Sequence, residues 1–121
     1  MKILLVEGHL ALAEMSCRVL EDIHHHEVQL ATTAAEALGG FPNLEPELVL
    51  VDIHLPDMDG YELARRIRSL PGAAETLLVA LTCFGNVDDA TARAAGFDSS
   101  NRSWCARSCP ACVTRFVTVA P

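Results

Sequence analysis

Short runs of hydrophobic residues recur along most of the chain, separated by more polar segments. Three of these runs are continuous, at residues 3–6, 48–51 and 77–81. A continuous run of this length predicts a strand that is buried on both faces, as the strands of parallel sheets are. Residues 27–31 alternate between polar and hydrophobic side chains and predict a further strand.

The segments that follow these strands have the spacing or the capping residues of helices. The predicted helices cover residues 10–20, 34–38, 61–68 and 88–95. Thr33 and Glu36 form a capping box at the start of the second helix, which we expect to end at the Gly39-Gly40 pair. Strands that alternate with helices predict an α/β fold, in which helices cover both faces of a doubly wound parallel sheet.

Polar or reactive residues follow three of the predicted strands. Glu7 and Gly8 come after the first strand, Asp52 after the third and Thr82 after the fourth. Because the carboxyl ends of parallel strands meet at one edge, we expect two carboxylates and a hydroxyl to converge there. Clustered carboxylates repel one another unless a cation joins them, and oxygen ligands favour Mg²⁺. Turn residues or helix caps explain the same spacing equally well, so spacing alone leaves both interpretations open.

Four segments of the chain together resemble a known family. The most specific is the Asp-x-x-Leu-Pro-x-Met-Asp-Gly motif at residues 52–60. The others are Ile-Leu-Leu-Val-Glu at residues 3–7, Val-Ala-Leu-Thr at 79–82 and Ala-Ala-Gly-Phe-Asp at 94–98. In order and spacing they resemble the receiver domains of two-component response regulators, over residues 1 to about 98. The resemblance implies a flavodoxin-like fold with a five-stranded parallel sheet, and a signalling module rather than an enzyme.

The resemblance also implies roles for particular residues. Asp52 occupies the place of the phosphoacceptor, which receives a phosphoryl group from a histidine kinase or a histidine phosphotransfer protein and becomes a 4-aspartylphosphate. Glu7 belongs to the acidic pocket, and Thr82 supplies the hydroxyl that contacts the phosphoryl group. The implied cofactor is Mg²⁺, held by Asp52, Glu7 and the backbone carbonyl of His54.

Three positions depart from the pattern of the family. Gly8 stands where the family has a metal-binding Asp, so one carboxylate ligand is lost. Ser103 takes the place of a Lys that pairs with phosphoryl oxygens, and Trp104 takes the place of the Pro after it. These departures favour an alternative function, that of a pseudo-receiver that binds other proteins independently of phosphorylation.

The composition changes near the end of the chain. Residues 1–96 hold 6 Lys and Arg against 15 Asp and Glu, whereas residues 97–121 hold 3 Arg and 1 Asp. The second segment has no Leu, Ile, Glu or Lys, but it has three of the five Cys. We therefore expect a receiver body at residues 1–98. At residues 99–121 we expect a divergent or frame-shifted segment that replaces the fifth strand and helix.

The overall composition limits the partners of the protein. A net charge of −7 argues against nucleic-acid binding through a basic face. No hydrophobic run is long enough for a membrane span, and the start of the chain lacks the pattern of a signal peptide. We therefore expect a cytoplasmic protein, whose self-association would be limited to a weak homodimer.

Overall fold

The computed structural model describes residues 2–18, 21, 26–81 and 89–101 of the chain. Within them, five strands alternate with four α-helices. The strands are β1 (Lys2–Val6), β2 (Glu27–Ala31), β3 (Leu48–Asp52), β4 (Leu77–Leu81) and β5 (Ser99–Asn101). The helices are α1 (Leu10–Arg18), α2 (Ala34–Leu44), α3 (Gly60–Arg68) and α4 (Asp89–Ala95), with a short 3₁₀ helix, η2 (Ala73–Glu75), before β4.

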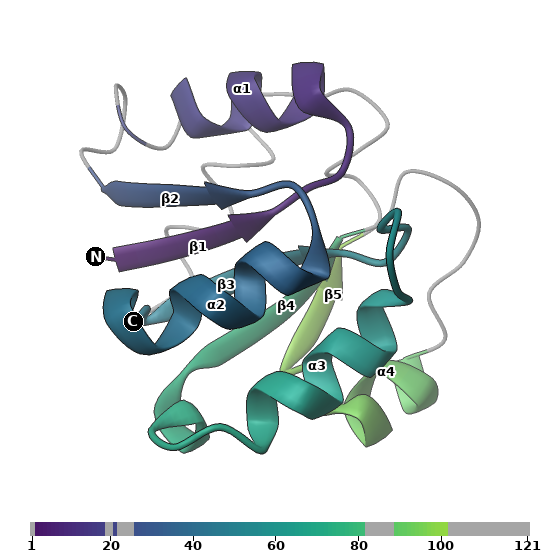
Figure 1. Ribbon diagram of the computed structural model, residues 1–121. Coiled ribbons are helices and arrows are strands. Elements are labelled where there is room, and N and C mark those ends of the chain that lie inside the picture. Colours follow the sequence, from purple (N-terminus) through teal and green to yellow (C-terminus); the bar gives the residue numbers. More distant parts are fainter. Residues whose placement is uncertain (1, 19–20, 22–25, 82–88, 102–121) are drawn as a thin grey trace.

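The five strands form one parallel sheet in the order β2-β1-β3-β4-β5. Helix α1 lies on one face of the sheet, and α2, α3 and α4 follow one another across the other face (Figure 1). This is the doubly wound, flavodoxin-like arrangement expected from the sequence, which is thereby confirmed. None of the helices in the described part of the chain is long and apolar enough to cross a membrane.

Strands β1 and β3 lie inside the molecule. Every residue from Ile3 to Val6 in β1 and from Leu48 to Asp52 in β3 is buried. Neighbouring residues of a strand point to opposite faces, so both faces of these strands are buried and neither can carry polar side chains at low cost. This burial explains why their hydrophobic runs are continuous rather than alternating.

Helix α2 is longer than the sequence indicated. It does not end at the Gly39-Gly40 pair but continues to Leu44, so that part of our prediction is wrong. Phe41 and Leu44 extend the buried face of the helix, and their burial offsets the low helix propensity of the glycines. The helix ends at Glu45, which has a left-handed φ of 51° and donates its N–H to the carbonyl of Phe41.

The sheet also continues past the boundary that we placed at residue 98. Ser99 pairs with Val79 and Asn101 with Leu81, so a short fifth strand is present despite its polar sequence. Asp98 starts this pairing, since its N–H donates to the carbonyl of Leu78 at 2.8 Å. Backbone hydrogen bonds form whatever the side chains are, which is why a polar segment can join the sheet edge. The rest of the segment expected to be divergent, including Ser103 and Trp104, lies outside the described residues.

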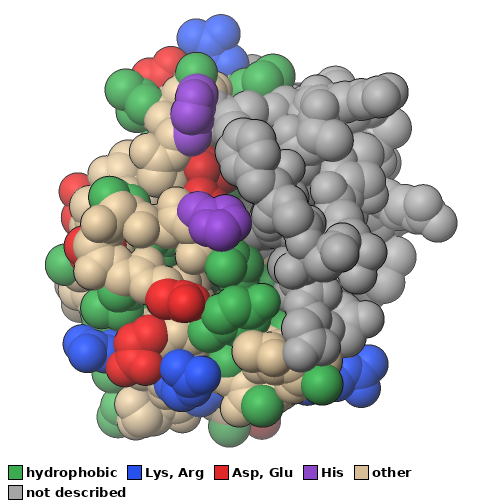
Figure 2. All heavy atoms as spheres, turned by 90° about the vertical axis from the view of Figure 1, so that its right-hand side faces the viewer, with side chains coloured by type: hydrophobic (Ala, Val, Ile, Leu, Met, Phe, Trp, Pro, Cys, Tyr) green, Lys and Arg blue, Asp and Glu red, His purple; other side chains and the backbone are tan. Residues whose placement is uncertain are grey.

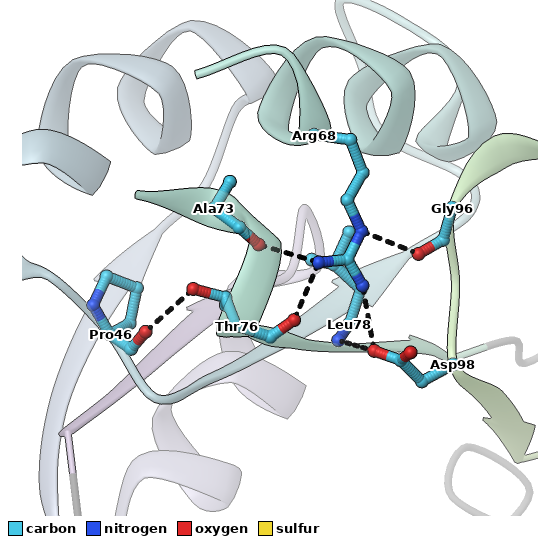
Figure 3. A network of polar contacts seen from close by, with 7 residues as sticks. All are labelled: Pro46, Arg68, Ala73, Thr76, Leu78, Gly96 and Asp98. Carbon is cyan, nitrogen blue, oxygen red and sulfur yellow. Dashed lines mark hydrogen bonds and ion pairs between the residues drawn. The ribbon is translucent and has the colours of Figure 1, made fainter. Parts of the chain in front are cut away.

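A partly buried arginine closes the amino-terminal edge of the sheet (Figure 3). Arg68, at the end of α3, donates to three carbonyls, those of Gly96 at 2.9 Å and of Ala73 and Thr76 at 2.7 Å each. It also forms an ion pair of 2.8 Å with Asp98. We call these five residues the Arg68 network. It joins α3, η2, the start of β4 and the end of α4.

Two further features fit the surroundings to this network. Asp98 Oδ2 also accepts the N–H of Leu78 at 2.9 Å, so one carboxylate binds both Arg68 and the start of β4. Gly96 has a φ of +109°, and a Cβ there would lie 2.7 Å from Cγ of Arg68. A glycine is therefore required at this position by both backbone conformation and space.

We expect Arg68→Ala to lower the free energy of unfolding by about 2–4 kcal/mol, because it leaves several partly buried carbonyls without donors. Arg66→Ala is the matched control, since the contact of the Arg66 side chain within the described residues is an exposed ion pair with Glu62 on the same helix. Urea denaturation followed by circular dichroism measures both. Equal losses in the two variants would contradict a special role for Arg68.

Candidate functional site

Two acidic side chains lie side by side at the carboxyl edge of the sheet. Strands β1 and β3 are neighbours, and Val6 pairs with Val51, so the next residues, Glu7 and Asp52, come together. Both are buried, with 1% of Glu7 and 6% of Asp52 exposed. The convergence of these two carboxylates is the main feature that the strand ends predicted.

Each carboxylate is oriented by the backbone two residues further on. An oxygen of Glu7 accepts the N–H of His9, and an oxygen of Asp52 accepts the N–H of His54, both at 3.0 Å. Both histidines are exposed, so the buried carboxylates lie close to side chains that solvent can reach. Acidic and histidine side chains accordingly lie close together on the face shown in Figure 2.

Burial and mutual contact change the acidity of this pair. The pKa of Glu7 is raised to about 8. Burial is the largest cause, and a hydrogen bond with Asp52 and the negative charge of Asp52 raise the pKa as well. The N–H of His9 opposes this rise because it stabilises the ionised form. Near neutral pH, Glu7 therefore holds a proton, and the pair keeps one negative charge instead of two.

Gly8 lies at the same edge, beside the loop that follows β3. A Cβ on Gly8 would lie 3.8 Å from the carbonyl oxygen of His54 and 3.0 Å from Cδ of Pro56. The second distance is tighter than ordinary packing allows, so the bare backbone of Gly8 lets this loop approach closely. Gly8, where the resemblance implies a metal-binding Asp, therefore lies next to the other site residues.

The donor set suits a divalent cation with oxygen ligands. Glu7, Asp52 and the carbonyl of His54 supply hard oxygen donors at one edge, and Mg²⁺ commonly uses one or two carboxylates and completes its shell with water. A cation would also replace the proton that the buried pair otherwise needs. Within the described residues, no three His, Cys, Asp or Glu side chains form a ready metal cluster, so the carbonyl and water are needed as ligands.

The remaining predicted site residue, Thr82, follows the described end of β4. Leu81 pairs with Asp52, so β4 reaches the same edge, but Thr82 itself lies outside the described residues. Asp57, whose carboxylate binds the first turn of α2, was not among the predicted site residues. Nothing in the local sequence signals this contact, because it joins segments 23 residues apart.

We expect the stability of the metal-free protein to fall as the pH rises from about 5 to 8, by on the order of 2 kcal/mol from Glu7 alone. The pKa of Glu7 is raised in the folded state from an ordinary value of 4.5, so the folded state binds more protons in this window. Glu7→Gln should remove this part of the pH dependence, because Gln mimics the protonated acid. Urea denaturation in EDTA at several pH values tests this, with exposed Glu14→Gln as the control. An unchanged pH dependence in Glu7→Gln would refute the assignment.

Comparison with known proteins gives one consistent family. The family model of the response regulator receiver domain matches residues 3–98. The DNA-binding dual master transcriptional regulator RpaA of Synechocystis is 28% identical over 98 residues, which are 81% of this chain and 39% of that protein. Transcriptional regulatory protein TrcR of Mycobacterium tuberculosis is 33% identical over 80 residues, or 64% of this chain and 30% of that protein. The chain thus spans less than half the length of these curated relatives.

Solved structures agree with the family model. A putative response regulator from Chloroflexus aurantiacus is 26% identical, with a TM-score of 0.83 over 97% of this chain and 93% of its own. Chemotaxis response regulator CheY4 of Vibrio cholerae has the same fold, with a TM-score of 0.88, 20% identity and coverage of 99% and 98%. The Mn²⁺-bound form of response regulator Rcp1 also shares the fold, with a TM-score of 0.81, 23% identity and coverage of 98% and 92%. The fold and the matched residues together show that this chain belongs to the response regulator receiver domain family.

Proposed function

We propose that this protein accepts a phosphoryl group on Asp52 from a histidine kinase or a histidine phosphotransfer protein. A carboxylate oxygen of Asp52 attacks the phosphorus, the N–P bond of the donor phosphohistidine breaks, and the imidazole leaves with the bonding electrons. The product is a 4-aspartylphosphate. On this proposal the chain is a cytoplasmic signalling module and not an enzyme.

The observation that carries the proposal is the buried contact between Asp52 and Glu7 at the carboxyl edge of the sheet. The N–H of His54 holds one oxygen of Asp52, so the carboxylate has a fixed orientation and its other oxygen is the nucleophile. Near neutral pH, burial and the contact with Asp52 keep Glu7 protonated, and a bound cation would favour its ionised form. A bound Mg²⁺ would neutralise charge on the transferring group.

A pseudo-receiver is the alternative function, and one residue of the site favours it. Gly8 brings no carboxylate to the edge where Glu7 and Asp52 lie, so a divalent cation has one ligand fewer than the family pattern provides. In this alternative the fold binds a partner protein in a single state, without transfer of a phosphoryl group. Phosphorylation of the isolated protein separates the two functions.

We expect the protein to gain the mass of one phosphoryl group when it is incubated with acetyl phosphate and Mg²⁺. The gain should disappear in Asp52→Asn, which keeps the shape and the hydrogen bond to His54 but removes the nucleophile. Intact-protein mass spectrometry measures both. No gain in the wild type at any Mg²⁺ concentration would remove phosphoryl transfer and favour the pseudo-receiver.

Restoring the missing carboxylate should strengthen cation binding. We expect Gly8→Asp to bind Mg²⁺ roughly ten-fold more tightly than the wild type, because a third carboxylate joins the pair. Gly8→Ala is the matched control, since its Cβ meets Pro56 in the same way but adds no ligand. Isothermal titration calorimetry gives the affinities. A similar affinity in both variants would show that the cation does not bind beside Gly8.

A further inference from the structure

The loop between β3 and α3 crosses the carboxyl end of β1 and reaches α2. Strand β1 lies between β2 and β3, and α2 follows β2, so a contact from this loop to α2 must pass over β1. Pro56 marks the crossing, because its Cδ lies 3.0 Å from where a Cβ of Gly8 would be. The next residue, Asp57, makes the contact on the far side.

Asp57 binds the first turn of α2 with both carboxylate oxygens. One oxygen accepts the N–H of Ala34 at 2.9 Å and the other accepts the N–H of Ala35 at 3.1 Å. These are helix amides without an intrahelical partner, and the helix dipole favours a negative charge beside them. The pKa of Asp57 is lowered accordingly, first of all by the N–H of Ala34.

The sequence of α2 supplies only part of its own N-terminal cap. Thr33 accepts the N–H of Glu36 at 3.1 Å, as the capping box predicts. The Glu36 carboxylate, however, turns back to the N–H and hydroxyl of Thr32. The amides of Ala34 and Ala35 are therefore left to Asp57. The Asp57 carboxylate accepts both of these N–H groups and so completes the N-terminal cap of α2.

The other end of the loop is fixed at the site. Gly60 donates its N–H to the carbonyl of Ile53 at 2.9 Å, and His54 pairs with Asp59 in an isolated bridge. Asp57 lies between these pairs, three residues after His54. Its attachment to α2 therefore limits where the His54 peptide can lie, and that peptide binds Asp52 through its N–H and faces Gly8 through its carbonyl.

We propose that Asp57 is a positioning residue, which sets the His54 peptide against the Asp52–Glu7 pair by fastening the loop to the start of α2. In this arrangement α2 supports the site although it contributes no side chain to it. The effect on cation binding rests on the function proposed above, whereas the effect on the His54 peptide does not depend on it.

The test compares variants that weaken the same helix cap with and without touching the loop. Asp57→Ala removes both bonds between the loop and α2, and Asp57→Asn keeps the shape with one acceptor. Thr33→Ala is the matched control, because it removes a bond at the same helix end that does not involve the loop. Amide hydrogen exchange by NMR follows the N–H of His54 and of Gly60, and Mn²⁺ titration gives the cation affinity.

We expect the His54 amide to exchange about ten-fold faster in Asp57→Ala than in Thr33→Ala, with Asp57→Asn between them. The Mn²⁺ dissociation constant should rise in the same order. Equal exchange in Asp57→Ala and Thr33→Ala overturns the proposal, because the cap alone then explains the effect. Failure of the wild type to accept a phosphoryl group would overturn the proposed function, while the exchange comparison would still decide the role of Asp57.

Discussion

The parallel pairing of β1 with β3 is the constraint on which the site depends. It brings Glu7 and Asp52 together in a place that water hardly reaches. Two ionised carboxylates cannot share such a place without compensation, so the pair holds either a proton or a cation. The same pairing that buries the core therefore creates a demand for positive charge at its edge.

The charge balance differs between the amino-terminal and the carboxyl edge of the sheet. At the amino-terminal edge, the positive charge is part of the protein. There Arg68 donates four hydrogen bonds, three to backbone carbonyls and one to the carboxylate of Asp98. At the carboxyl edge, the buried pair instead holds a proton near neutral pH, and on the function proposed above a cation would replace it. One edge is thus a permanent structural support, and the other is open to a change of state. On the function proposed above, this division would let the fold stay stable while a cation binds at one edge.

Much of the fold could be predicted from the sequence, because strand burial and strand order leave a strong periodic signal. The convergence of Glu7 and Asp52 followed from the same signal, since it depends only on where strands end. The end of α2 was predicted wrongly at Gly39-Gly40, because tertiary burial of Phe41 outweighed local propensity. The Arg68 network and the Asp57 contact could not be predicted, because they join side chains to backbone groups that are distant in sequence.

The divided cap of α2 also bears on the entropy cost of folding. Thr33 accepts the N–H of Glu36, which is only three residues further along the chain, so this bond forms within the helix end itself. Asp57 is 23 residues away from Ala34, so its bonds to α2 require the closure of a longer segment of chain. The two bonds from Asp57 are therefore long-range contacts, and closing the intervening chain costs them more entropy than the bond of Thr33. The cap of α2 is thus complete only when the loop beside Asp52 lies in its folded position.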